Sequence, residues 1–329
     1  MTKTKKITPM KVAVVGAGKQ NNGIGRYISK YFHLNGSCVV AVLGTTTHSS
    51  RSAALDLSCF GIEAAAYTSF ETMILREDPD AIVIASPQET HLHFLHESIE
   101  AGLHLFCEKP FVWPLDQEVS VLVEELLDRA ARKGLVVCMN SQWPFCLPWY
   151  EELCGPLRPE DITGFSMYTQ PPGTGLFMVP DAAPHALSML YQVLGPGKVG
   201  GVTMHPGSRE AELCFTYHAG SGECGVSLKL VHNPRQPRDF RFGFNGRIVT
   251  RYIEPQSYAL QLCRGDSQCS PVDPLNLSVR DFLSALTDGG PPLIGPRHIL
   301  DTTVMLRDLY HQCELFWRRS DAAPARHAT

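Results

Sequence analysis

Apolar runs alternate with amphipathic stretches along the first third of the chain. Four runs have the continuous apolar character of strands covered on both faces, at 12–15, 39–43, 81–85 and 103–107. The stretches between them have helical periodicity, at 25–34, 51–60 and 91–101, and a helix over 115–133 and a strand over 135–139 follow. This order predicts an α/β Rossmann domain, a doubly wound parallel sheet that closes near Trp143.

The pattern changes after this point to short segments of period two. They occupy 164–169, 212–217, 225–230 and 247–253, as expected for half-buried antiparallel strands. Asn245-Gly246 predicts a hairpin turn, prolines bracket a short helix near 150, and the chain ends in helices over 278–286 and 298–316. We therefore predict two domains, 1–143 and an α+β domain over 144–329 with one open sheet, whose closing helices pack back on the first domain.

Composition narrows the class of protein. A net charge of -4 without a long basic run argues against nucleic acid as a partner. The chain has no apolar stretch near the roughly 20 residues of a membrane span. Eleven scattered cysteines without a C-x-x-C pair predict buried thiols in a reducing, cytoplasmic compartment, and the basic leader at 1–9 predicts a disordered tail. His91, His93 and His96 lack a completing ligand set, so no metal site is predicted.

A glycine-rich turn follows the first strand directly. Gly16 and Gly18 begin a G-x-G pattern, but Asn21 stands where the third glycine belongs, and an insertion would restore the pattern with either Gly23 or Gly25. Such glycines let the backbone approach a pyrophosphate at the N-terminus of a helix. We predict that this turn binds a dinucleotide, with a purely structural turn as the alternative.

The end of the second strand bears on the choice of cofactor. The residues from Gly44 to Arg51 contain no carboxylate for a ribose 2′-hydroxyl. Thr45, Thr46 and Arg51 instead offer hydroxyls and a guanidinium, which suit a 2′-phosphate. This favours NADP(H) over NAD(H), unless Arg51 only begins a solvated helix.

Two further turns would open onto the same crevice, beyond the carboxyl ends of parallel strands. Glu108, Lys109 and Pro110 follow the 103–107 strand, and the Lys109 ammonium there can stabilise a developing alkoxide. A surface lysine is the alternative. After the 81–85 strand, Ser86, Pro87 and His91 would lie under the nicotinamide ribose, although His91 is equally suited to capping or packing.

Asp181 and His185 lie four residues apart at the start of a predicted helix, after the glycine-rich segment 172–175. They share one helix face, so the carboxylate can orient the imidazole or both can address one polyol. The alternative is that Asp181 caps the helix while His185 lies in its first turns.

With these residues in hand, the sequence resembles the glucose-fructose oxidoreductase and inositol dehydrogenase family, Gfo/Idh/MocA. The resemblance is carried by the glycine-rich turn, Ser86-Pro87 with His91, 101–110 with its Glu-Lys-Pro ending, 181–185 and Asp281-Phe282-Leu283. It implies a Rossmann domain, a second domain with a large open mostly antiparallel sheet, and homodimers or homotetramers that pair through that sheet. It also implies NAD(P)-dependent oxidoreduction of a sugar, a cyclitol or a related small molecule.

The resemblance also implies roles for individual residues. Lys109 matches the lysine that contacts nicotinamide and the reacting oxygen, His185 the acid or base, and Asp181 its support. Asn140, Gln142 and Trp143 fall where family members place substrate contacts. The chain departs from the family pattern in its long first turn and in the lack of the usual glycine between Asp181 and His185. Pro184 constrains the backbone just before His185.

The sequence therefore predicts an NADP(H)-preferring dehydrogenase or reductase of a secondary alcohol or ketone. Glu108 and Lys109 would lie beside the cofactor, and His185 would exchange the substrate proton. One alternative is a reductase of a carbon-nitrogen double bond on the same fold. The other is a non-catalytic NADP-binding sensor or scaffold.

Overall fold

The computed structural model describes residues 9–18, 23–254 and 259–321, so the leader at 1–8 and the turn residues 19–22 lie outside the described residues. The chain divides into two compact units. Unit 1 comprises Met1–Trp113, Leu122–Asn140 and Leu275–Pro296. Unit 2 comprises Pro114–Val121, Ser141–Pro274 and Arg297–Thr329. The chain therefore leaves unit 1 and returns to it twice.

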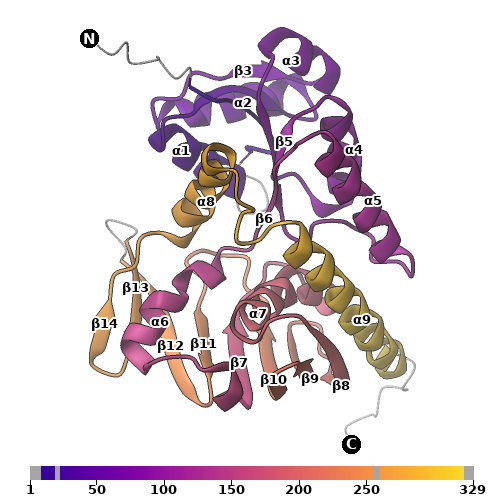
Figure 1. Ribbon diagram of the computed structural model, residues 1–329, viewed down its shortest axis with the longest axis vertical. Coiled ribbons are helices and arrows are strands. Elements are labelled where there is room, and N and C mark those ends of the chain that lie inside the picture. Colours follow the sequence, from indigo (N-terminus) through magenta and orange to yellow (C-terminus); the bar gives the residue numbers. More distant parts are fainter. Residues whose placement is uncertain (1–8, 19–22, 255–258, 322–329) are drawn as a thin grey trace, which may run out of the picture. The chain divides into compact units, whose positions relative to one another are not determined.

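The described strands of unit 1 form one parallel sheet of six strands in the order β3-β2-β1-β4-β5-β6. Figure 1 labels β3, β5 and β6 of this sheet. They are β1 (Lys11–Val15), β2 (Cys38–Leu43), β3 (Ala65–Tyr67), β4 (Ala81–Ile84), β5 (His104–Glu108) and β6 (Val137–Asn140). The inner strands β1, β4 and β5 are almost wholly buried, as in sheets covered on both faces. The strand order reverses between β1 and β4, which confirms the predicted doubly wound α/β class.

The crossover helices of unit 1 are α1 (Ile24–Leu34), α2 (Thr47–Ser58), α3 (Phe70–Glu77), α4 (His91–Glu100) and α5 (Val119–Arg132). Two predicted starts are wrong. Helix α2 begins before Arg51 because the Thr46 hydroxyl accepts a hydrogen bond from Ser49 N at 3.1 Å and caps the helix. Helix α5 begins at Val119 and not at 115, because Asp116 Oδ1 accepts a hydrogen bond from Glu118 N at 3.2 Å in a turn that precedes the helix.

Helix α8 (Pro274–Asp288) supplies Leu275, Val279 and Phe282 to the core of unit 1. The Phe282 ring makes edge contacts with Phe32 and Phe106, with centroids 5.8 and 5.6 Å apart. The neighbouring Asp281 carboxylate accepts a hydrogen bond from Leu293 N at 2.7 Å. The Asp281-Phe282-Leu283 motif is therefore structural and fixes a late segment of the chain to the first sheet.

Unit 2 has a mostly antiparallel sheet whose eight described strands run in the order β14-β13-β12-β11-β7-β10-β9-β8 (Figure 1). Only the β10 and β7 pair is parallel in this described sheet. The strands are β7 (Gly164–Thr169), β8 (Gly197–His205), β9 (Glu210–Ala219), β10 (Gly222–Val231), β11 (Phe240–Phe244), β12 (Arg247–Ile253), β13 (Leu260–Arg264) and β14 (Ser267–Cys269). The predicted hairpin turn joins β11 to β12, with positive φ at Asn245 and Gly246, and the predicted open sheet is confirmed.

Helices α6 (Leu147–Cys154) and α7 (Met178–Leu194) pack against the inner face of this sheet. Residues of β9 and β10 alternate between buried and exposed, so the other face is open. Helix α9 (Pro296–Asp321) contacts α7 where His298 Nε2 lies 3.0 Å from Ser188 Oγ. No helix within the described ranges is long and apolar enough to cross a membrane.

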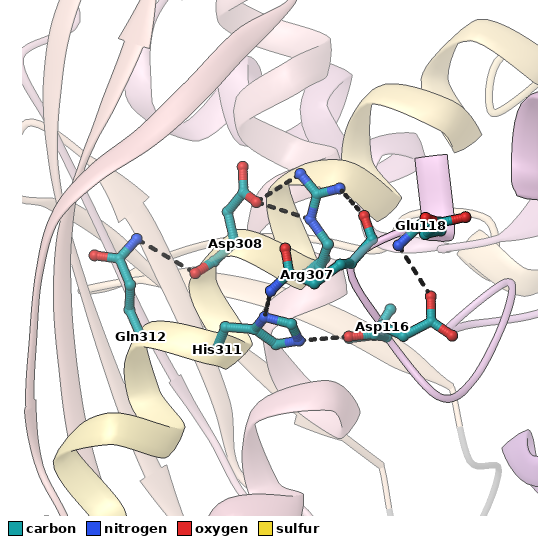
Figure 2. A network of polar contacts seen from close by, with 8 residues as sticks. Asp116, Glu118, Arg307, Asp308, His311 and Gln312 are labelled. Atoms are coloured by element: carbon teal, nitrogen blue, oxygen red, sulfur yellow. Dashed lines mark hydrogen bonds and ion pairs between the residues drawn. The ribbon is translucent and has the colours of Figure 1, made fainter. Parts of the chain in front are cut away.

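Helix α9 also fastens the segment 114–121 of unit 2, as Figure 2 shows. His311 Nε2 donates to Leu115 O at 2.6 Å, and His311 Nδ1 accepts from Gln117 Nε2 at 3.0 Å. Arg307 Nη1 donates to Gln117 O at 3.2 Å. These contacts hold the bends and the turn between β5 and α5 against helix α9.

Candidate functional site

The glycine-rich turn lies directly against the turn that follows β4. Gly16 has a φ of 89°, and a Cβ there would lie 2.5 Å from Ser86 N, so only glycine fits. A Cβ on Gly18 would meet nothing within 4 Å. Gly16 thus brings two loops together, while the backbone at Gly18 stays open to a ligand.

The structure separates the roles of the two candidate third glycines. Gly25 lies in the first turn of α1, and a Cβ there would lie 2.6 Å from Gly16 O. Gly23 is the N-cap of α1, in a left-handed conformation. No side chain of the described residues caps α1, and its first turn has no acidic residue. Gly25 therefore allows α1 to pack closely on the turn at Gly16, and the uncapped N-terminal end of α1 suits a pyrophosphate.

Of the residues predicted to bind a 2′-phosphate, Thr45 and Thr46 lie between β2 and α2, and Arg51 lies in α2. The Thr46 hydroxyl is occupied in the helix cap with Ser49, whereas Thr45 and Arg51 are exposed. Arg51 lies in the second turn of α2, beside a shallow surface hollow lined also by Thr47, His48, Ser52 and Leu55. His48 and Arg51 both line this hollow. Sequence reasoning missed His48 because it lies in the predicted loop.

His91 joins the turn after β4 to the loop after β5. Its ring is 1% exposed, with Nε2 2.9 Å from Ser86 O and Nδ1 2.8 Å from Pro110 O. Burial lowers the pKa of His91, and the two backbone carbonyls oppose that shift. Both ring nitrogens thus face protein carbonyls, and the imidazole holds the Ser86 turn against the residue that follows Lys109.

The Ser86 turn is further braced by hydroxyl contacts. Ser86 Oγ lies 2.6 Å from Thr90 Oγ1, which donates to Pro87 O at 2.8 Å. Pro87 precedes a short 3-10 turn that leads into α4. Ser86 and Pro87 are therefore held to the start of α4 through Thr90.

Lys109 directly follows β5, where Glu108 pairs in register with Asn140 at the end of β6. Asn140 Nδ2 donates to the Glu108 carboxylate, and both side chains are buried. Asn140 Oδ1 is buried without a hydrogen-bond partner among the described residues. Lys109 is partly buried beside this pair. The carboxyl ends of β5 and β6 therefore carry a carboxylate, an ammonium and an unused amide oxygen.

In unit 2, Asp181 and His185 lie one turn apart on α7. The helix begins at Met178, directly after the 3-10 turn Gly175–Phe177, so Asp181 lies inside the first turn and the alternative that it caps the helix is wrong. Pro184 lies within the helix without breaking it. The His185 ring is 6.4 Å from the Trp143 ring in an edge geometry.

Trp143 begins a cluster that the sequence did not reveal. Its ring is 3% exposed and stacks on Phe240 at 4.0 Å, and Arg251 lies over it at 5.4 Å. Nearby Arg238 is affected by the negative charge of Asp181, which opposes the lowering of its pKa by burial. The sequence could have placed Arg251 on the covered face of the sheet, because it lies two residues from the buried Val249 on the same strand.

The predicted site residues thus form two groups. Unit 1 holds the glycine-rich turn, the Ser86 turn, Glu108, Lys109 and Asn140, and unit 2 holds Gln142, Trp143, Asp181 and His185. Gln142 Oε1, like Asn140 Oδ1, is a buried acceptor without a partner among the described residues. The same described part of the chain has no cluster of three or more His, Cys, Asp or Glu side chains placed to hold a metal.

Residues 10–141 match the model of the Gfo/Idh/MocA family, described as an oxidoreductase family with an NAD-binding Rossmann fold. The match runs from β1 to the end of β6, so it includes the glycine-rich turn, the Ser86 turn and Lys109. It confirms the resemblance inferred from the sequence. The nicotinamide nucleotide as cofactor class follows from the same match.

Curated relatives align over parts of the chain. A D-glucoside 3-dehydrogenase from Escherichia coli K12 is 25% identical over 213 residues, which are 60% of this chain and 58% of the relative. An inositol 2-dehydrogenase from Klebsiella pneumoniae is 33% identical over 101 residues, 31% of this chain and 28% of the relative. These alignments span less than two thirds of each relative.

A solved structure extends the likeness of fold beyond this region. UDP-N-acetylglucosamine 3-dehydrogenase GnnA from Acidithiobacillus ferrooxidans superposes with a TM-score of 0.70 at 17% identity. The superposition covers 94% of this chain and 100% of that chain. The folds of both units therefore have counterparts in a known dehydrogenase structure.

Proposed function

From the premise that residues 10–141 form the NAD-binding Rossmann domain of the Gfo/Idh/MocA oxidoreductases, we propose that the chain moves a hydride between nicotinamide and a secondary alcohol or ketone. The substrate is a sugar, a cyclitol or a related small molecule. One observation carries this proposal: Gly16 packs on Ser86, and His91 joins Ser86 to Pro110. The nucleotide-binding turn and the Lys109 loop therefore share one edge of the sheet.

The side chains have complementary tasks. Bound nicotinamide supplies the hydride chemistry. In the oxidative direction His185 accepts the hydroxyl proton, and the Lys109 ammonium donates a hydrogen bond to the same oxygen as its negative charge grows. Asp181, one turn away, orients the imidazole. Substrate hydroxyls donate to the buried amide oxygens of Asn140 and Gln142, and Trp143 provides an apolar surface.

NADP(H) is the preferred cofactor in this proposal, with NAD(H) as the alternative. Arg51 and Thr45 are exposed beyond β2, and no carboxylate lies between Gly44 and Arg51. A guanidinium provides both charge and paired donors for a 2′-phosphate. The occupied Thr46 hydroxyl contributes mainly by fixing the start of α2.

The proposal is tested by titrating the purified chain with NADPH and NADH while following energy transfer from protein to nicotinamide. We expect tighter binding of NADPH, and a loss of about tenfold to a hundredfold in Arg51→Ala, because a charged hydrogen-bond partner is removed. NADH binding should hardly change in that variant. The matched control is Arg132→Ala, which removes another exposed arginine of unit 1.

Other outcomes select among the alternatives. Equal or tighter binding of NADH would overturn the cofactor preference but leave the hydride transfer. Turnover of sugars or cyclitols that collapses in Lys109→Ala, with nucleotide affinity kept, supports the enzyme. Turnover only with imines would identify the carbon-nitrogen reductase. Nucleotide binding without any turnover, unaffected by Lys109→Ala, would favour the sensor.

The proposal includes a homodimer or homotetramer that pairs through the sheet of unit 2. The alternately exposed residues of β9 and β10 leave one face of that sheet open to pairing. It also places the chain in the cytoplasm, as its free cysteines suggest. A monomeric mass by analytical ultracentrifugation would contradict the assembly, and recovery in a secreted fraction would contradict the location.

A further inference from the structure

The side chain of Arg251 lies on the covered face of the unit 2 sheet. It lies directly across from Phe240 in the β11–β12 ladder, so both side chains project from the same face. Its guanidinium carbon lies 5.4 Å from the Trp143 ring centre and 5.7 Å from that of Phe240. Trp143 in turn contacts His185. Arg251 is therefore one aromatic ring away from the proposed base.

The positive charge of Arg251 has little compensation from the described residues. Nη2 donates to the backbone oxygen of Arg238, and Nε is buried without a partner among those residues. No carboxylate of the described chain forms an ion pair with it, and the negative charge of Asp239 acts only at longer range. Burial lowers the pKa of Arg251 to about 10, so it remains charged near neutral pH. A buried cation of this kind is costly unless an anion joins it.

Arg238 adds a second cation to this group. It precedes β11, its Nε donates to Asn233 O at 2.8 Å, and its backbone oxygen is the acceptor for Arg251. The charge of Asp181 acts on the Arg238 guanidinium, which links the two arginines to the Asp181 and His185 face of α7. We call Arg238 and Arg251 the arginine pair.

We propose that the arginine pair binds an anionic group of the substrate, a carboxylate or a phosphate, so that the substrate is an acidic or phosphorylated sugar. The planar guanidinium offers paired donors that match two oxygens of either group. The Arg251 guanidinium lies over the rings of Trp143 and Phe240, and these cation–π contacts limit its side-chain freedom before an anion binds. The identity of the substrate as a sugar rests on the proposed function, whereas the anion site does not.

The test measures binding by calorimetry, without nucleotide, of four probes: glucuronate, glucose 6-phosphate, glucose and myo-inositol. We expect the unaltered chain to bind one of the anionic probes at least about tenfold more tightly than either neutral probe, because a hydrogen bond between charged groups is added. Glucuronate and glucose 6-phosphate separate the carboxylate from the phosphate. Equal affinity for all four probes, or no binding of either anion, would overturn the proposal.

Variants of Arg251 test whether this preference depends on the arginine pair. Arg251→Gln should remove the preference for the anion by about tenfold to a hundredfold and leave the weak affinity for glucose unchanged. Arg251→Lys keeps the charge and should retain part of the preference, which separates the anion contact from packing. The matched control is Arg241→Gln on the exposed face of β11, where the guanidinium lies over Tyr168. Equal losses for anionic and neutral probes in Arg251→Gln would indicate a structural role and contradict the proposal.

Turnover separates the failure of this inference from the failure of the proposed function. NADP(H)-linked turnover of neutral sugars, with anions bound no better, would reject the anion site and keep the enzyme. Arginine-dependent binding of an anionic probe that no nicotinamide nucleotide oxidises would keep the anion site and reject the enzyme. With both correct, Arg251→Gln raises KM for the anionic substrate far more than it lowers kcat.

Discussion

Gly25 and Gly18 differ in what a single methyl group would meet. A Cβ on Gly25 would lie 2.6 Å from Gly16 O and 3.1 Å from Ala17 Cα, both backbone atoms that cannot rotate away. A Cβ on Gly18 would meet nothing within 4 Å. The packing of the protein thus requires a glycine at position 25, whereas Gly18 leaves space that a ligand can use.

The two alanine variants should therefore fail in different ways. Gly25→Ala should lower the free energy of unfolding by about 1–3 kcal/mol, since α1 must move from the turn. Gly18→Ala should unfold at nearly the same urea concentration as the unaltered chain but bind NADPH more weakly, because its methyl group occupies the path of the pyrophosphate. Urea unfolding and nucleotide titration of both variants measure this. A stable Gly25→Ala variant would show that α1 is not fixed by this contact.

At the scale of elements, His91 couples the start of α4 to the loops after β4 and β5. Its Nδ1 faces Pro110 O, next to Lys109, while its Nε2 faces Ser86 O. Asparagine can place an amide nitrogen near the Nδ1 position, and glutamine can place one near the Nε2 position. The two substitutions therefore restore different halves of the link.

If His91 positions Lys109, variants with Asn, Gln or Leu at position 91 should differ in kcat. His91→Asn should retain the most kcat, and His91→Gln and His91→Leu should lose about tenfold or more, as the loss of one buried hydrogen bond allows. The Kd for NADPH should change little in His91→Asn. Steady-state kinetics beside nucleotide titration gives the comparison. Equal kcat losses in all three variants, in step with lower stability, would reduce His91 to a packing residue.

The elements that the sequence predicted well are those whose pattern is decided locally. The bounds of β7 and β12 were predicted as observed, because glycines or a hairpin turn limit a clear period of two. Strand β3 was missed because its three residues lie at the sheet edge with little burial, and α3 because only Met73 in it is buried. Such elements depend on tertiary contacts that local periodicity does not record.

The residues of the candidate site also divide into those that a local motif reveals and those that only tertiary contacts reveal. Lys109, Asp181 and His185 stand in motifs whose spacing alone suggests chemistry. The strand pattern could place Arg251 on the buried face of β12 but could not show its role, since that role depends on Trp143, more than a hundred residues earlier. The choice between Gly23 and Gly25 likewise required the distance between a helix and a turn.

At the scale of the whole molecule, buried histidines make stability depend on pH. His298 at the start of α9 is 3% exposed, and its Nε2 lies 3.0 Å from Ser188 Oγ on α7. Burial lowers the pKa of His298 to about 3 from an ordinary value of 6.5. Between these values the unfolded chain binds the proton and the folded chain does not. The contribution of neutral His298 to the free energy of unfolding is therefore full above pH 6.5 and is lost progressively as the pH falls toward 3.

From neutral pH to about pH 5 this single group should lower the free energy of unfolding by about 2 kcal/mol, at about 1.4 kcal/mol for each pH unit below 6.5. His298→Gln keeps a polar group near Ser188 but does not titrate, so its stability should decline less over that range by the same amount. His205→Gln, an exposed position on β8, should follow the unaltered chain. Urea unfolding at both pH values measures the three slopes. An equal decline in His298→Gln would mean that other groups, and not the junction of α7 and α9, control the acid sensitivity of unit 2.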